Sequence, residues 1–298
     1  MNTADAIERE FSDAIVSAGL TPPPEITADG KLHRFSSSGK RGDDSGWFVL
    51  HVDGVVAGAF GDWRSGLSQT WRAKSSRSLS PTERTAQREW IATARRAREA
   101  EEARTQATAA ERAATIWASA GPARADHPYL VRKRVKPHGL RVHRGALVVP
   151  MRDAAGALHS LQFIGAEGDK RFLSGGRVAA CYYGLGRAPR SGEQLIVGEG
   201  FATAASISES TGGAVVVAFN AGNLEPVARA LRGKYPEARI VIAADNDESG
   251  TGQRAAQAAA RAVGAIVATP PTAGDDFNDV HRELGAASVC RILETACA

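Results

Sequence analysis

From residue 192 onward, short runs of apolar residues alternate with segments of helical pattern. Strands made of continuous apolar residues are buried on both faces, because an exposed face would require alternating polar side chains. The alternation therefore predicts a parallel sheet with helices on either side, as in an α/β fold. The predicted strands are 194–198, 214–219, 239–244 and 265–268, and the predicted helices are about 200–211, 224–234 and 251–263, with one more helix after the last strand.

Acidic residues directly follow the first and third of these strands and come soon after the fourth. Glu199 precedes Gly200, Asp245 and Asp247 share one strand end, and a further group occupies 275–279. The carboxyl ends of parallel strands form the ligand crevice of an open sheet, so we expect these carboxylates to meet there. Carboxylates suit Mg²⁺ or Mn²⁺, which keep water and phosphate oxygens as further ligands. One acid alone would also be explained as a helix cap.

Charge is segregated along the chain. Residues 121–190 carry thirteen lysines and arginines against four acids, whereas residues 191–298 carry eight against thirteen. A basic block can hold a phosphate backbone and an acidic block can hold a divalent cation. The pattern favours an enzyme that processes nucleic acid over a merely solvated charged face.

The preceding residues predict three further parts. Residues 1–20 have the spacing of a short helix, and residues 31–73 read as small β structure with Trp47, Trp63 and Trp71. We expect these tryptophans to form the core of a small sheet, with a base-stacking surface as the alternative. A long helix without Gly or Pro is expected next, as a spacer. The predicted domains are 1–77, 78–120, 121–191 and 192–298.

Composition narrows the class of protein. Three cysteines without a CxxC pair argue against a disulfide framework or a zinc ribbon. No run approaches the ~20 apolar residues of a membrane span, and the first residues lack a signal-peptide pattern. We expect a cytoplasmic protein that does not contact a membrane.

The acidic pattern resembles that of the Toprim domain, an α/β module shared by primases, topoisomerases and several nucleases. That domain has a glutamate after its first strand and Asp-x-Asp after its third, as at Glu199 and 245–247. The run Glu199-Gly200-Phe201-Ala202-Thr203-Ala204 is similar, with Phe for Tyr, to the EGYATA signature of primases from conjugative plasmids and satellite phages. Segments 127–133, 170–173, 220–224 and 276–279 resemble those that flank the signature.

The resemblance implies a DNA primase that makes short RNA primers on a single-stranded DNA template from NTPs, for replication of a plasmid, phage or integrative element. Mg²⁺ or Mn²⁺ would be the cofactor, and a separate helicase or initiator the partner. It implies Glu199, Asp245 and Asp247 as catalytic metal ligands, Asp276 as an auxiliary ligand and Asp279 as a second auxiliary residue. Implied contacts to nucleotide or template come from Lys133, Lys170, Arg171, Asn220 and Asn223.

The sequence departs from the family pattern in two respects: no cysteine set for a zinc ribbon and no GxxxxGK[ST] loop of a helicase domain are present. Two other functions remain open. A Toprim nuclease would use the same acids to hydrolyse a phosphodiester, and a non-catalytic module would bind single-stranded DNA only. A topoisomerase is disfavoured, although Tyr129, Tyr182 and Tyr183 are candidates for a reactive tyrosine. His127, before Pro128, is interpreted as functional or as a turn cap.

Overall fold

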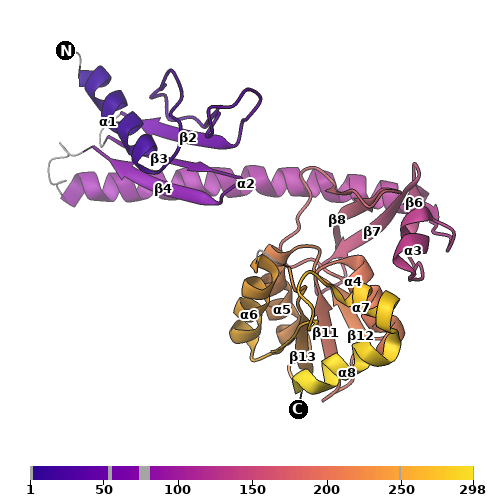
Figure 1. Cartoon of the computed structure of the whole chain (residues 1–298). Coiled ribbons are helices and arrows are strands. Elements are labelled where there is room, and N and C mark those ends of the chain that lie inside the picture. The colour runs from indigo at the N-terminus through magenta and orange to yellow at the C-terminus, as the bar shows by residue number, and fades with distance from the viewer. Residues whose placement is uncertain (1–2, 53–55, 74–80, 248–249, 298) are drawn as a thin grey trace. The chain divides into compact units, whose positions relative to one another are not determined.

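A computed structural model describes residues 3–52, 56–73, 81–247 and 250–297 (Figure 1). The chain divides into two compact units, 1–98 and 99–298, and the division falls inside one long helix. The predicted boundary at 77/78 lies outside the described residues. No described helix is long and apolar enough to cross a bilayer.

In the first unit a helix packs on a four-stranded antiparallel sheet, and the unit also includes the beginning of the long helix. Apolar residues of the helix, Phe11 and Ile15, pack on Phe48 and Phe60 from the two central strands. Trp71 joins this core as predicted, with its ring 5.2 Å from that of Phe11, but Trp63 is exposed. The core prediction is therefore wrong for Trp63 and also for Trp47, which alternates with the core residue Phe48 and lies on the other face of the sheet. The elements are α1 (Thr3–Ser17), β1 (His33–Phe35), β2 (Gly46–His51), β3 (Ala57–Asp62) and β4 (Leu67–Arg72), in the sheet order β1-β2-β3-β4.

The long helix α2 (Pro81–Ser119) ends at the predicted place, just before Gly121-Pro122. Within the second unit, the last turns of α2 pack against a sheet and are not only a spacer between domains. Ala113 is fully buried and packs with Val148, Leu161 and Phe163 on one face of a sheet. That face needs a cover because its apolar residues would otherwise meet water. The C-terminal part of α2 therefore belongs to the core of this unit.

The sheet under α2 is antiparallel and forms the basic half of the second unit. Alternate residues of its central strand face opposite ways: Val148 faces α2, whereas Leu147 and Val149 join a core shared with the C-terminal half. Its elements are β5 (Gly121–Pro122), α3 (Pro128–Lys133), β6 (Arg141–His143), β7 (Ala146–Arg152), β8 (Leu158–Ile164) and β9 (Lys170–Phe172), in the order β5-β6-β7-β8-β9.

The C-terminal half has the predicted α/β architecture. Strands β11, β12, β13 and β14 are parallel, and α4, α7 and α8 cover one face while α5 and α6 cover the other. An antiparallel edge strand, β10, was not predicted. The elements are β10 (Tyr183–Leu185), β11 (Gln194–Gly198), α4 (Phe201–Thr211), β12 (Ala214–Val217), η1 (Ala221–Asn223), α5 (Leu224–Lys234), β13 (Arg239–Ala243), α6 (Thr251–Val263), β14 (Ile266–Ala268), α7 (Phe277–Leu284) and α8 (Ala286–Cys297), in the sheet order β10-β12-β11-β13-β14.

Candidate metal and nucleotide site

The acids singled out from the sequence leave the sheet at one edge. Strands β11 and β13 are neighbours, and Gly198 pairs with Ala243. Glu199 and Asp245 therefore emerge side by side from two parallel strands. Strand β14 lies next to β13, and the loop after it leads to Asp276 at the start of α7. The topology brings together acids that are far apart in sequence.

Burial and mutual repulsion raise the pKa of Asp245 to about 7. Burial is the largest cause, followed by the negative charges of Asp276 and Glu199. Oδ1 of Asp245 is buried and has no hydrogen-bond partner among the described residues. A buried carboxylate oxygen without a partner is costly, so a ligand that supplies positive charge would stabilise it.

Glu199 shares this environment. Burial raises the pKa of its carboxyl, the ammonium of Lys170 opposes that shift, and the charge of Asp247 adds to it. Lys170 comes from β9 of the basic half, and its Nζ lies 3.5 Å from where a side chain on Gly200 would begin. The Lys170 ammonium therefore lies beside the turn that follows Glu199. Lys170 is thus a cation at the acidic edge, which is the sheet edge where Glu199 and Asp245 emerge.

Asp247 is held at the beginning of α6. Its Oδ2 accepts a hydrogen bond from the backbone amide of Gly252 at 3.0 Å, and its Oδ1 accepts one from Thr251 at 3.3 Å. The capping alternative therefore applies to Asp247. These bonds fix the position of the Asp247 carboxylate at the start of α6.

Asp276 and Asp279 form a reciprocal cap on α7. Oδ1 of Asp276 accepts from the Asp279 amide at 2.8 Å, and Oδ2 of Asp279 accepts from the Asp276 amide at 3.3 Å. Asp279 also pairs with Arg282 at 3.0 Å. Asp276 acts on the pKa of Asp245, so it lies near the acidic edge, whereas the carboxylate of Asp279 is engaged within its own helix.

Asn246, between the two aspartates, was not assigned a role from the sequence. Its side-chain amide donates to the carbonyls of Pro270 and Thr272, at 2.9 and 3.0 Å. Its backbone amide donates to the carbonyl of Asp275 at 3.0 Å. Asn246 therefore ties the loop that carries Asp245 to the loop that leads to Asp276.

The basic half contacts the acidic half through α3. His127 caps that helix: its Nδ1 accepts from the Tyr129 amide at 3.3 Å, and its Nε2 lies 3.1 Å from the carbonyl of Gly145. The turn-cap interpretation is confirmed. Tyr129 is 2% exposed, and burial together with the charge of Asp276 raises its pKa to about 12. A buried phenol that keeps its proton to high pH does not suit the role of an exposed nucleophile.

The remaining residues predicted to contact nucleotide or template differ in their exposure and in their hydrogen bonds. Lys133 ends α3. Arg171 is exposed on β9, with its guanidinium 5.5 Å from the Phe163 ring. Asn220 caps η1, accepting from Asn223 at 2.9 Å. Asn223 is 3% exposed, and its amide group is bonded to Ala180, Cys181 and Ala218. For both asparagines the structure supports bracing of the loop after β12 rather than an open contact surface.

Among the described residues, no group of three or more His, Cys, Asp or Glu side chains is arranged so that it could hold a metal ion by itself. Magnesium sites that handle nucleotides commonly use one or two carboxylates and complete the shell with water and phosphate oxygens. The donor set that fits such an ion here is Asp245 with its unpartnered Oδ1, next to Glu199.

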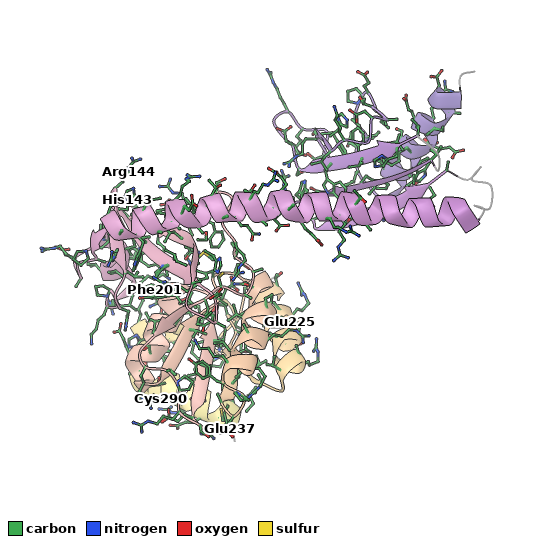
Figure 2. The ribbon with its side chains drawn as sticks, turned by 180° about the vertical axis from the view of Figure 1, so that it is seen from behind. His143, Arg144, Phe201, Glu225, Glu237 and Cys290 are labelled. Atoms are coloured by element: carbon green, nitrogen blue, oxygen red, sulfur yellow. The ribbon has the colours of Figure 1, made fainter. Side chains whose placement is uncertain are left out.

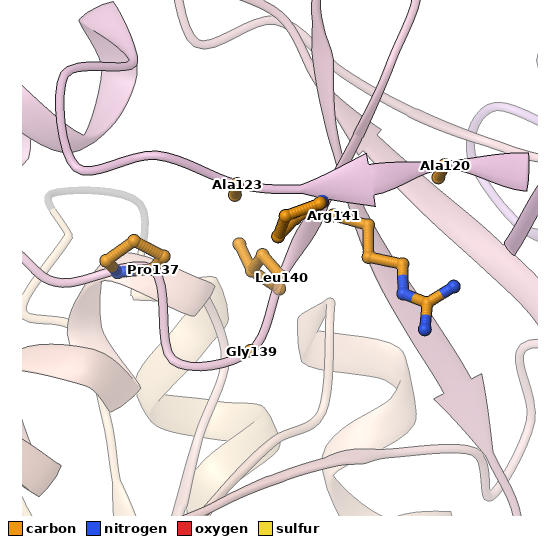
Figure 3. A pocket seen from close by; sticks show the side chains of 7 residues that line it. Ala120, Ala123, Pro137, Gly139, Leu140 and Arg141 are labelled. Carbon is orange, nitrogen blue, oxygen red and sulfur yellow. The ribbon is translucent and has the colours of Figure 1, made fainter.

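A pocket of about 290 Å³ lies in the basic half, away from the carboxylates (Figure 3). Small and apolar residues line most of it, and Arg141 is its charged lining residue. The Arg141 guanidinium lies 4.5 Å from the Trp117 ring and donates to the Trp117 carbonyl at 2.5 Å. The arginine therefore fastens α2 to this sheet.

Comparison with known proteins supports the resemblance. Residues 194–287 match the family described as Toprim domain. Two DNA primases TraC of Escherichia coli are 36% and 33% identical to the chain over 278 and 273 residues. Each alignment covers 86% of this chain but only 26% and 19% of the relatives, so the chain spans about a quarter or less of their length.

Solved structures are more distant. The primase fragment of the bacteriophage T7 primase-helicase is 18% identical, with a TM-score of 0.45, over 55% of this chain and 73% of that one. The Aquifex aeolicus primase, with its zinc-binding and RNA polymerase domains, is 12% identical, with a TM-score of 0.46, over 98% of this chain and 85% of that one. Residues 194–287 are thus a Toprim domain, as the sequence predicted, in a chain that resembles the TraC primases over most of its own length.

Proposed function

We propose that the chain is a DNA primase that uses the acidic edge to join ribonucleotides on a single-stranded DNA template. The observation that carries this proposal is the unpartnered, buried Oδ1 of Asp245 among neighbouring carboxylates, with Lys170 facing them. The similarity to DNA primases TraC supports the choice of reaction.

Glu199 and Asp245 would hold the divalent ion, with Asp247 and Asp276 beside them. Mg²⁺ or Mn²⁺, when bound, would neutralise the phosphates and lower the pKa of a primer 3′-hydroxyl. Asp247 is positioned by the α6 amides, so it keeps its place when the ion is absent. The raised pKa of Glu199 makes its carboxylate a stronger proton acceptor than a free glutamate.

Lys170 would neutralise the triphosphate of the incoming nucleotide, because it is the cation that acts on both Glu199 and Asp245. Lys133 and Arg171 would contact the template, while Asn220 and Asn223 would hold the loop beside Glu199. A separate helicase or initiator would supply the open template. Primer synthesis of this kind belongs in the cytoplasm, where the three free cysteines remain reduced.

The test is primer synthesis with single-stranded DNA, labelled NTPs and either Mg²⁺ or Mn²⁺. Wild-type protein should produce short labelled RNA, and Glu199→Gln and Asp245→Asn should abolish it. Glu225→Gln is the matched control, since Glu225 lies on α5 and pairs only locally with Arg229 (Figure 2). It should retain wild-type activity.

Two results would overturn the proposal. One is the absence of primers with both metals across templates of varied sequence. The other is cleavage of circular single-stranded or duplex DNA in the absence of NTPs, lost in the same two variants, which would make the site a nuclease.

A further inference from the structure

The sheet of the first unit has one face that packs against α1 (Figure 1). The opposite face, termed the outward face, carries the exposed residues Arg34 and Arg72. Phe48 and Phe60 are opposite each other in the register and pack against α1. Successive residues of a strand face opposite sides of the sheet. Trp47, with its partners Arg34 and Gly61 in the register, therefore lies on the outward face.

Trp47 is built into this outward face. A Cβ on Gly61 would lie 2.8 Å from Nε1 of Trp47, so the indole lies across β3 where only glycine leaves room. Trp63 follows β3 directly, and its backbone amide donates to the carbonyl of Ser45 at 2.9 Å. The two indole rings are 5.6 Å apart, and Trp63 is 59% exposed. The pair is a fixed aromatic surface open to solvent.

A guanidinium accompanies the aromatic pair. Cζ of Arg34 lies 6.0 Å from the centre of the Trp63 ring, and its Nε donates to the carbonyl of Asp44 at 2.9 Å. Arg72, opposite Ala57, is exposed further along the same face. The face therefore combines ring surfaces with anchored positive charge.

Charge in the first unit differs between α1 and the segment of strands and loops that follows it. Helix α1 carries four acids and one arginine. The strands and loops of 31–72 expose six cations, which are Lys31, Arg34, Lys40, Arg41, Arg64 and Arg72.

Two acids of the same segment are internally satisfied. Hydrogen bonds from Ser38 and Ser45 hold the pKa of Asp43 well below its usual value, and Asp62 accepts from the Arg64 amide at 3.0 Å. Both carboxylates are buried, so their charges are not displayed beside the aromatic pair. Asp44 is the one exposed acid among the described residues of 31–72, so exposed cations outnumber exposed acids in this segment, as the binding of a polyanion requires.

We propose that the outward face formed by Trp47, Trp63 and Arg34 binds single-stranded DNA, with a base stacked on Trp63 and phosphates near Arg34 and Arg72. Unpaired bases expose the ring faces that stack on tryptophan, and a guanidinium adds attraction to bases and phosphates. A duplex keeps its bases stacked on each other and cannot use such a surface. The binding does not depend on primer synthesis by the acidic edge.

The test is fluorescence anisotropy with the full chain, a labelled single-stranded oligonucleotide and the duplex of equal length, in metal-free buffer without NTPs. Trp63→Ala should weaken single-strand binding by roughly 5- to 100-fold, and Trp63→Phe should restore most of it. Arg34→Ala should weaken binding, whereas Arg9→Ala, on α1, should not. An oligonucleotide carrying 5-iodouracil should crosslink to Trp63 or Trp47.

Unchanged single-strand affinity in a folded Trp63→Ala variant would overturn the proposal, as would an equal loss for duplex. A change in sedimentation with no change in DNA affinity would instead identify the face as a contact between copies of the chain. Since Glu199→Gln should bind DNA normally, the outcome separates failure of this site from failure of the proposed primase activity.

Discussion

Asn278 donates a hydrogen bond from its side chain to the carbonyl of Lys133 at 2.7 Å, across 145 positions of sequence. It also donates to Oγ of Ser206 at 2.9 Å, and it is completely buried. One amide thus joins α7, α4 and the end of α3. Asn278 therefore ties the half of the unit that carries the acidic edge to the basic half.

Asn278→Ala should lower the free energy of unfolding by roughly 1 to 3 kcal/mol, because the Lys133 carbonyl and Ser206 lose a buried donor. Urea denaturation measures the effect. Gln106→Ala, which removes an exposed pair with Glu102 on α2, should change stability by less than about 0.5 kcal/mol. Equal effects of the two substitutions would show that the buried bond is unimportant.

The metal-free protein should lose stability as pH rises from about 4 to 7. The pKa of Asp245 is 3.8 for a free carboxyl and about 7 in the fold, so the folded form holds the proton more tightly. Between these two pH values unfolding releases the proton, so a rise in pH favours unfolding. Above about pH 7 the stability that protonated Asp245 contributes is completely lost. Urea midpoints in EDTA across this range measure the trend.

Asp245→Asn should flatten that pH dependence, whereas Glu225→Gln should follow the wild type. Added Mn²⁺ should restore wild-type stability at pH 8 and should do little for Asp245→Asn. Parallel curves for wild type and Asp245→Asn would contradict the assigned environment of Asp245.

Lys170→Met should reduce primer synthesis by about a hundredfold, because the positive charge opposite Glu199 and Asp245 is removed. Lys170→Arg should restore part of the activity, since charge is retained while its placement changes. Lys136→Met, an exposed lysine in the same basic half, is the control and should lose little. Steady-state rates at varied NTP concentration distinguish these outcomes, and equal losses at 136 and 170 would remove any special role for Lys170.

Gly252→Ala should impair activity without destabilising the fold. A Cβ there would lie 2.9 Å from Oδ2 of Asp247 and would displace that carboxylate, although alanine favours the helix. We expect a loss of ten- to a hundredfold in primer synthesis at unchanged or higher thermal stability. Gly233→Ala in α5, where nothing lies within 4 Å, should leave activity intact. An active Gly252→Ala enzyme would separate Asp247 from the reaction.

The C-terminal sheet and its acids could be predicted because strand burial and strand order follow local patterns. After Gln194 the run 195–198 is apolar, and the observed strand β11 has the limits of the predicted strand 194–198. Glu199 and Asp245 then follow from the rule that ligands bind at the carboxyl ends of parallel strands. The division of Asp276 and Asp279 between the acidic edge and a helix cap depends on side-chain rotamers, which spacing does not determine.

Other features depend on contacts between distant segments. The burial of Ala113 on α2 requires a sheet that begins several residues later, and an alanine-rich helix has the same pattern when exposed. Trp71 and Trp63 have similar surroundings in sequence, yet strand parity directs Trp71 to the core while Trp63 lies beyond the end of β3. Asn246 and Asn278 act through backbone carbonyls in remote loops, and such partners leave no signal in one sequence.

Binding of Mn²⁺, followed by electron paramagnetic resonance in the presence of a nucleoside triphosphate, tests the central claim most directly. The wild-type chain and Glu225→Gln should bind the ion with equal affinity, and Asp245→Asn and Glu199→Gln should bind it at least tenfold more weakly, since each removes a charged oxygen ligand. Undiminished binding by Asp245→Asn and Glu199→Gln would contradict the assignment of the acidic edge as the metal site.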